Sequence, residues 1–274
     1  MDILRLPKID GHCHVLDPQR FPYAPDVGYH PQGQEVGDAR CFSAVMDCHG
    51  VRHALLVGPN SGYGLDNRCL LDAIAQGGGR FKGVAVLPND CGLERLQQLQ
   101  AQGIVGVAFN AALHGEAHYA DIEPLLLRLR QLGLWAQFQV QNDQLPFFLP
   151  MIERSQVRVM VDHCGRPDVA RGLAQPGFQA LLALGRTGQA VVKLSGPIKF
   201  SGRPFPFDDV APYAHALAGA FGLGRCIWAS DWPYLKAPYR LDYGPMLGWF
   251  ASLFTPSECQ QIMWDTPKAL LFPD

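Results

Sequence analysis

Short runs of aliphatic and β-branched residues recur along the chain at intervals of about 25 to 35 residues, each followed by a stretch with helical spacing of its apolar residues. A short apolar run that ends in turn-forming residues is typical of a buried strand in a parallel sheet. The pattern predicts eight strands, at residues 9–15, 53–58, 83–88, 105–110, 135–140, 157–162, 190–195 and 226–230.

Apolar residues three and four positions apart predict helices between these strands. The predicted helices lie at residues 39–49, 67–76, 93–102, 122–132, 145–154, 178–186 and 210–221. A last helix is expected to begin after Thr255 and to run towards Leu271. Thr255 and Glu258 have the spacing of a capping box, and Pro256 suits the first helical position.

Eight alternating strand and helix units in 274 residues predict an α/β fold, a single (β/α)8 barrel of the TIM type over residues 1–274 with a C-terminal helix. An open dinucleotide-binding sheet is disfavoured, because no Gly-x-Gly-x-x-Gly follows the first strand. Prolines and glycines gather at 18–37, 59–64 and 196–206, and no change in composition marks a second domain. We expect residues 18–37 to fold over the barrel mouth.

The charge balance disfavours several classes of partner. Lys and Arg number 23 against 25 Asp and Glu, which gives a net charge of −2 with no block of like charge. Nucleic acid and anionic membrane surfaces are therefore not expected as partners. No apolar run is long enough to span a bilayer and the first residues lack the order of a secretion signal, so a cytoplasmic protein is expected. The eight cysteines never form Cys-x-x-Cys and are expected to be packing residues.

Polar motifs stand at the ends of three of the predicted strands. Side chains alternate across a strand, so His12 and His14 share one face of the first strand. Active groups of such a barrel lie at the C-terminal ends of its strands, and closure brings the eighth strand beside the first. We therefore expect Asp231 to lie next to His12 and His14. In the sixth strand, alternation predicts that His163 faces the mouth and that Asp162 faces the helices.

Further polar side chains at the same ends of the strands are candidates for binding a small molecule. The loop after the second strand is polar and leads into a helix N-terminus, which suits an oxygen-rich ligand. The fifth strand carries Gln137, Gln139 and Gln141 on one face, an unusual set for a buried strand unless these amides are hydrogen-bonded. The candidates for substrate binding are Asn60, Ser61, Tyr63, Asn67, Asn110, Gln139, Ser195 and Lys199.

Five motifs distributed over the whole chain resemble those of the amidohydrolase superfamily. They lie at residues 10–14 (DGHCH), 60–67, 161–167 (VDHCGRP), 193–196 (KLSG) and 230–233 (SDWP). Within the superfamily, the chain is similar to the branch of lactonases that includes the pyrone dicarboxylate hydrolases and the sugar lactonases. The resemblance implies a deformed barrel in which Asp231 activates water, while His12, His14 and His163 polarise a carbonyl group.

Two departures from the family pattern change what is expected of the site. Metal-dependent relatives supply a lysine or histidine near the end of strand four or five, whereas strand five here offers only glutamines. We therefore expect either no required cofactor or one weakly bound zinc on His12, His14 and Asp231, and no binuclear centre. Ala108 stands where the dicarboxylate hydrolases carry an arginine, so a substrate with at most one carboxylate, held by Lys199 and the 60–67 loop, is expected.

The hypothesis that follows is a hydrolase that opens a small, oxygen-rich lactone. Asp231 would accept a proton from water, and the histidines would stabilise the oxyanion. One alternative is a zinc-dependent decarboxylase of the same superfamily. The other is a barrel that binds a metabolite, lactone or carboxylate, without catalysis, since the fold alone does not choose among these.

Overall fold

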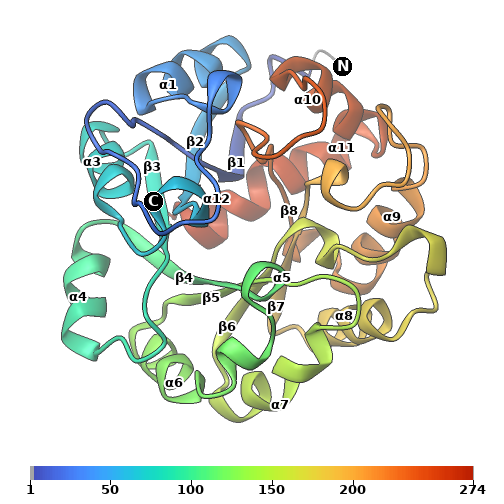
Figure 1. The fold of residues 1–274 in the computed structure, drawn as a ribbon. Helices are drawn as coiled ribbons and strands as arrows, with labels where there is room; N and C mark the ends of the chain where they lie inside the picture. Colours follow the sequence, from blue (N-terminus) through green and yellow to red (C-terminus); the bar gives the residue numbers. More distant parts are fainter. Residues whose placement is uncertain (1–2, 274) are drawn as a thin grey trace.

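The computed structural model describes residues 3–273. An eight-stranded parallel sheet, in the order β1 to β8, forms a barrel with helices around it (Figure 1). The ends of these strands differ from the predicted ends by three residues at most, so the predicted (β/α)8 barrel is confirmed. The strands are β1 (Lys8–Cys13), β2 (Val51–Val57), β3 (Phe81–Ala85), β4 (Ile104–Asn110), β5 (Trp135–Gln139), β6 (Arg158–Val161), β7 (Ala190–Leu194) and β8 (Cys226–Trp228).

The predicted helices are all present, and within residues 3–273 three further α-helices were not predicted. Thr255 caps the C-terminal helical segment as expected, because its side chain accepts from the Glu258 backbone while the Glu258 carboxylate accepts from the Thr255 N–H. The helices are α1 (Ala39–Cys48), α2 (Asn60–Tyr63), α3 (Arg68–Gln76), α4 (Leu93–Ala101), α5 (Ala111–His114), α6 (Glu123–Leu132), α7 (Leu145–Ser155), α8 (Pro176–Arg186), α9 (Ala211–Phe221), α10 (Tyr243–Ser252), α11 (Pro256–Gln260) and α12 (Thr266–Leu271), the last two joined by a π-helical turn (Gln261–Asp265).

The unpredicted helices are α2, α5 and α10. The first two have only four residues each, too few to show a helical period. In α10 the glycines and proline at Gly244, Pro245 and Gly248 interrupt the pattern, yet the apolar face of the helix packs through Leu247 and Phe250. Tertiary packing therefore stabilises a segment whose local propensity is poor.

The apolar core has two layers, one inside the barrel and one between strands and helices. Ile9, Leu55 and Met160 belong to the inner cluster. Leu271 and Phe272, at the end of α12, belong to the same inner cluster, and Phe272 stacks on His53 near the start of β2. The C-terminal helix therefore closes the amino-terminal end of the barrel and leaves the opposite end for the site.

Strands β1 and β8 meet through a seam rather than a regular ladder, and across it a single parallel bridge joins Cys13 to Trp232 within residues 3–273. The Asp231 N–H donates to the His12 carbonyl (2.9 Å), and the His14 N–H donates to the Trp232 carbonyl (2.8 Å). This confirms the predicted proximity of Asp231 to His12 and His14.

Asp10 supports the same seam from the side of the helices. Its Oδ1 accepts hydrogen bonds from the Ser230 N–H (2.9 Å) and the His12 N–H (3.2 Å), and its Oδ2 accepts from the Tyr243 hydroxyl of α10 (2.8 Å). A single buried carboxylate thus ties the ends of β1 and β8 to α10.

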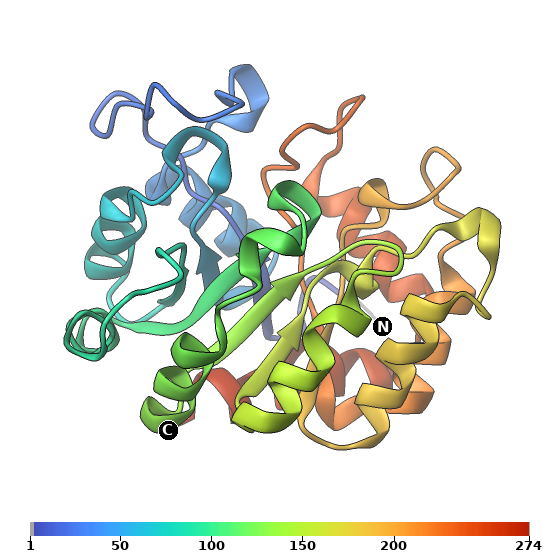
Figure 2. The same ribbon diagram turned by 60° about the horizontal axis from the view of Figure 1, so that its bottom comes forward.

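Residues 18–37 lie at the carboxyl end of the barrel, against the loops that follow β2 and β8. The Gly62 N–H donates to the Tyr29 carbonyl (2.8 Å), and the Lys236 N–H donates to the Glu35 carboxylate (2.5 Å). Figure 2 shows the loops after β1 and β8 projecting from the same end of the barrel. Among residues 3–273, no helix has the length and apolar character needed to cross a membrane.

Candidate active site

Three imidazoles converge on one carboxylate at the carboxyl end of the barrel. The Nε2 atoms of His12, His14 and His163 lie 3.9, 3.7 and 3.8 Å from Oδ1 of Asp231. All four residues are buried, with His14 the most exposed at 9%. Residues 219 positions apart in the chain are thereby brought together by barrel closure.

Each of these imidazoles is oriented by a contact at its other ring nitrogen. His14 Nδ1 lies 2.8 Å from the Val57 carbonyl, and His163 Nδ1 lies 3.0 Å from the Ser195 hydroxyl. His12 Nδ1 lies 3.3 Å from Asp162. Because the three Nδ1 atoms face the protein, the three Nε2 atoms face Asp231.

The predicted orientation of Asp162 is wrong, and the position of His163 has a different cause from the predicted one. In β6 the inner cluster contains Met160, so the same alternation directs Asp162 into the barrel rather than towards the helices. The strand ends at Val161, and residues 163–166 all have positive φ values. This left-handed turn, and not strand alternation, directs His163 towards Asp231.

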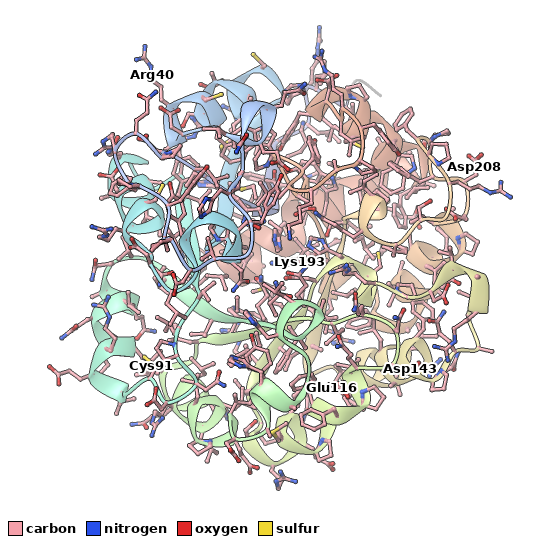
Figure 3. All side chains as sticks on the ribbon, in the orientation of Figure 1. Arg40, Cys91, Glu116, Asp143, Lys193 and Asp208 are labelled. Carbon is pink, nitrogen blue, oxygen red and sulfur yellow. The ribbon has the colours of Figure 1, made fainter. Side chains whose placement is uncertain are left out.

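A buried polar network beneath His12 was missed by sequence reasoning. The Lys193 ammonium lies 3.0 Å from Asp162 Oδ1, 3.2 Å from His12 Nδ1 and 2.5 Å from Gln137 Oε1. Gln137 also donates from Nε2 to Asp162 Oδ2 (2.9 Å). Figure 3 labels Lys193 near the centre of the barrel, far from the rim residues Asp208 and Arg40. In the sequence, this network is indicated by Gln137 and Lys193, two polar residues that alternate with apolar residues in buried strands.

The electrostatics of the cluster separate one ionised group from two neutral ones. Burial acts to raise the pKa of Asp231, but Lys199, His163 and His14 hold that pKa well below its usual range. Burial lowers the pKa of His12 to about 4 and that of His163 to about 3. At neutral pH, Asp231 is therefore a carboxylate, and His12 and His163 are neutral imidazoles.

A cavity of about 380 Å³ opens above these residues. Its rim includes a contact between the end of β4 and the start of α2, where the Asn110 amide donates to Asn60 Oδ1 (3.1 Å). Lys199 lines the same cavity, with Nζ 3.5 Å from Asp231 Oδ2 and 2.5 Å from the Leu235 carbonyl. Of the predicted substrate-binding residues, the cavity is lined by Asn60, Ser61, Asn110, Gln139 and Lys199.

The structure places the other three predicted substrate-binding residues elsewhere. Ser195 is buried beside His163 and contacts its Nδ1. The Tyr63 hydroxyl accepts from the Asp17 N–H (3.0 Å) and so supports the 18–37 segment. Asn67 exchanges hydrogen bonds with the backbone of Val86 through its amide (2.8 and 3.1 Å), which ties the loop after β2 to the end of β3. Tyr63 and Asn67 therefore lie outside this cavity.

A larger hollow of about 840 Å³ lies between residues 29–35 and the loop after β8. Its walls include Tyr234 and Tyr243 but none of the three convergent histidines, nor Asp231. The smaller cavity is therefore the candidate active site, because His14, His163 and Asp231 line it.

One divalent ion fits the donor set of the smaller cavity. His12, His14 and Asp231 offer ligand atoms within 4.8 Å of one another, and two imidazoles with a carboxylate are a donor set that zinc accepts in hydrolases. The Val57 carbonyl on His14 Nδ1 is the outer contact that commonly orients a ligating imidazole. A second cluster, formed by His12, Asp162 and His163, is different, because Lys193 already supplies a positive charge there.

The chain is similar to known proteins along nearly its whole length. The sequence profile of the family described as amidohydrolase matches residues 9–272. The chain is 29% identical to the 2-pyrone-4,6-dicarboxylate hydrolase of Comamonas testosteroni over 97% of this chain and 90% of the relative. It is 31% identical to the 4-sulfomuconolactone hydrolase of Rhizobium radiobacter over 95% of this chain and 88% of the relative.

A solved structure of a relative has the same fold as this chain. The crystal structure of a probable 2-pyrone-4,6-dicarboxylic acid hydrolase from Acinetobacter baumannii, with citric acid bound, superimposes with a TM-score of 0.86. That protein is 28% identical to this one, and the match covers 96% of this chain and 98% of the other. Since the family profile also spans nearly every residue of the barrel, this chain belongs to the amidohydrolase family.

Proposed function

We propose that this protein is a hydrolase that opens a small, oxygen-rich lactone by means of water activated by Asp231. The observation that carries the proposal is the convergence of three histidine Nε2 atoms on Asp231 Oδ1, at 3.7 to 3.9 Å, beneath a cavity of about 380 Å³. The relatives that match nearly all of this chain at 28–31% identity are named as hydrolases of a pyrone dicarboxylate and of sulfomuconolactone.

Asp231 has the properties that a general base requires. It is ionised at neutral pH and buried at the base of the cavity. A water molecule beside Oδ1 would transfer a proton to the carboxylate as its oxygen attacks the lactone carbonyl carbon. The ester C–O bond then breaks, and the proton held by Asp231 passes to the leaving ring oxygen, so that a hydroxy acid is formed.

The imidazoles would stabilise the negative charge that develops on the carbonyl oxygen. Because His12 and His163 are neutral, they can donate an N–H hydrogen bond without neutralising the carboxylate base. If a zinc ion is bound by His12, His14 and Asp231, it would supply Lewis acidity to the same carbonyl group. The chain's own groups already provide a base and donors, so we propose that metal is dispensable.

The decarboxylase alternative receives less support. A 2,6-dihydroxybenzoate decarboxylase from Rhizobium shares the fold at 14% identity, which says nothing about chemistry. The relatives with higher identity are lactone hydrolases.

A panel of lactones, followed by proton release with and without chelator, tests the proposal. Opening of at least one acidic or sugar lactone, with one proton released per ring opened, is the expected result. Release of carbon dioxide from an aromatic or pyrone carboxylate would instead establish the decarboxylase. Tight binding of lactones with no turnover would leave a non-catalytic barrel.

A further inference from the structure

Lys193 lies directly beneath His12, and the polar groups that it contacts are buried. Its ammonium lies 2.5 Å from Gln137 Oε1, 3.0 Å from Asp162 Oδ1 and 3.2 Å from His12 Nδ1. These four side chains belong to residues that are at most 1% exposed. The positions of their protons are therefore decided by these contacts rather than by solvent.

The amide of Gln137 shows which of these groups donate. Its Nε2 donates to Asp162 Oδ2 (2.9 Å), so its Oε1 faces Lys193 as an acceptor. A flipped amide would place an N–H group against the ammonium and a lone pair against the carboxylate. Burial acts to raise the pKa of Asp162, but the Lys193 ammonium holds that pKa below its usual value. Lys193 is thus a cation paired with a buried carboxylate.

The Lys193 ammonium determines the role of Nδ1 of His12. An ammonium has three N–H groups and no lone pair, so it can only donate. A proton on Nδ1 would therefore abolish the hydrogen bond from Lys193 to His12. Asp162 Oδ1 lies 3.3 Å from Nδ1 and could accept such a proton, yet this oxygen has no hydrogen-bond partner within residues 3–273. The geometry places the proton of neutral His12 on Nε2.

His14 has the opposite arrangement, two positions further along the chain. Its Nδ1 lies 2.8 Å from the Val57 carbonyl, which can only accept, so Nδ1 of His14 carries a proton. Neutral His14 then has a lone pair at Nε2, as a zinc ligand requires. Neutral His12 has an N–H group at Nε2, as a donor to an oxyanion requires. The two histidines therefore present different groups towards Asp231.

Resting on the proposed lactonase activity, we infer that Lys193 is a positioning residue that keeps the proton of His12 on Nε2, where it is donated to the carbonyl oxygen of the lactone. Lys193 acts through His12, because it is fully buried beneath the imidazole. The same proton occupies the position at which His12 would bind zinc together with His14 and Asp231. Lys193 therefore also weakens metal binding at this site.

Nuclear magnetic resonance measures the tautomer directly. In a proton–nitrogen correlation spectrum of protein with isotopically labelled histidine, recorded at neutral pH with chelator, protonated and unprotonated ring nitrogens have well-separated shifts. We expect wild-type His12 to be unprotonated at Nδ1 and His14 to be protonated there. The variant His12→Gln assigns the His12 signals by their loss. A proton on Nδ1 of His12 in the wild-type protein would overturn the inference.

Lys193→Met removes the ammonium and keeps an unbranched, buried side chain. Asp162 can then accept from Nδ1 of His12, so we expect this nitrogen to become protonated in the spectrum. Lys82→Met is the matched control, because Lys82 is a half-buried strand lysine beside Phe272 at the opposite end of the barrel. It should leave the His12 signals unchanged. An Nδ1 that stays unprotonated in Lys193→Met would contradict the role of Lys193.

Steady-state kinetics on the best lactone tests the consequence for turnover. Lys193→Met should lower kcat about 30-fold or more and change KM by less than about threefold, because the lost N–H group acts mainly in the transition state. An unchanged kcat would overturn the role of Lys193 and leave the lactonase proposal intact. Failure of the wild-type protein to hydrolyse any lactone would overturn the lactonase proposal itself, and the spectrum would still report the tautomer of His12.

Zinc affinity is a readout that does not depend on turnover. Competition with a chromophoric chelator should show that Lys193→Met binds zinc about tenfold or more tightly than the wild-type protein, since a carboxylate on Nδ1–H is a common partner of a zinc-bound imidazole. Lys82→Met should match the wild-type protein. Equal affinity in Lys193→Met would contradict the inference. Thermal unfolding checks the fold of each variant, and if Lys193→Met is unfolded, the wild-type spectrum decides.

Discussion

At the scale of single residues, the centre of the site is a carboxylate that stays ionised although it is buried among three imidazoles. Asp231→Asn keeps the shape of the side chain but cannot accept a proton from water. We expect the variant to fold with an unchanged circular dichroism spectrum and to lose about 100-fold or more in kcat. Steady-state kinetics on the best lactone measures this, and full activity in the variant would exclude Asp231 as the base.

Lys199 should set the acid limit of the reaction through the same carboxylate. Its ammonium acts to lower the pKa of Asp231. Lys199→Met should therefore raise that pKa and move the acid limb of kcat/KM to higher pH. Lys82→Met, beside Phe272 at the opposite end of the barrel, is the control and should leave the profile in place. An unchanged limb in Lys199→Met would contradict this coupling.

Metal content is a further property of these few residues. Because Lys193 supplies the charge in the second histidine and aspartate cluster, at most one ion per chain is expected. Elemental analysis should find less than one equivalent, and activity should survive chelation. Two tightly held ions, or complete inactivation by chelator with rescue by zinc, would refute this expectation.

At the scale of elements, the turn after β6 and the end of β7 together hold His163. Gly196 has a φ of +61°, and a Cβ at this position would lie 2.6 Å from His163 Nδ1. Gly196→Ala should displace the imidazole from Ser195 and reduce kcat about tenfold or more. Gly172→Ala is a matched control, because Gly172 also has a positive φ of 70° but no atom lies within 4 Å of the added methyl group.

Both glycine variants should lose stability from backbone strain, roughly 1 kcal/mol each or more. Only Gly196→Ala should lose activity in the fraction that remains folded. If Gly172→Ala lost activity to the same extent, displacement of His163 would not be the cause.

At the scale of the whole molecule, the buried neutral histidines make stability dependent on pH. The pKa of His12 in the folded protein, about 4, and that of His163, about 3, lie below the ordinary value of 6.5. The unfolded chain therefore binds more protons between pH 6.5 and these values. The stability that the two neutral histidines contribute is fully present above pH 6.5. The free energy of unfolding decreases by on the order of 2–3 kcal/mol per histidine as the pH falls towards 4.

Thermal unfolding from pH 8 to pH 4, with chelator present, measures this loss. Tm should be constant above pH 7 and fall below pH 6. His163→Gln, which removes one titrating group, should make the decline shallower, whereas His30→Gln at an exposed position should not. A Tm that does not change between pH 7 and pH 4 would show that these imidazoles are not held neutral by the fold.

The sequence by itself determined the barrel and the core of the site. Apolar runs and helical spacing are local properties of the chain, and their eightfold alternation is compatible with few folds. Because the carboxyl ends of parallel strands meet at one end of a barrel, the positions of His12, His14 and Asp231 in the sequence were sufficient to bring them together. The capping box at Thr255 is likewise local and was confirmed.

Only the tertiary structure decided which polar side chains face the site. The inward direction of Asp162 depends on the register of β6 against its neighbours, and the position of His163 depends on four successive left-handed residues that include three other than glycine. Neither is a property of local sequence, because such backbone angles persist only when surrounding contacts impose them. The Lys193 network and the positions of Tyr63 and Asn67 outside the cavity have the same origin, since packing between distant strands and loops determined them.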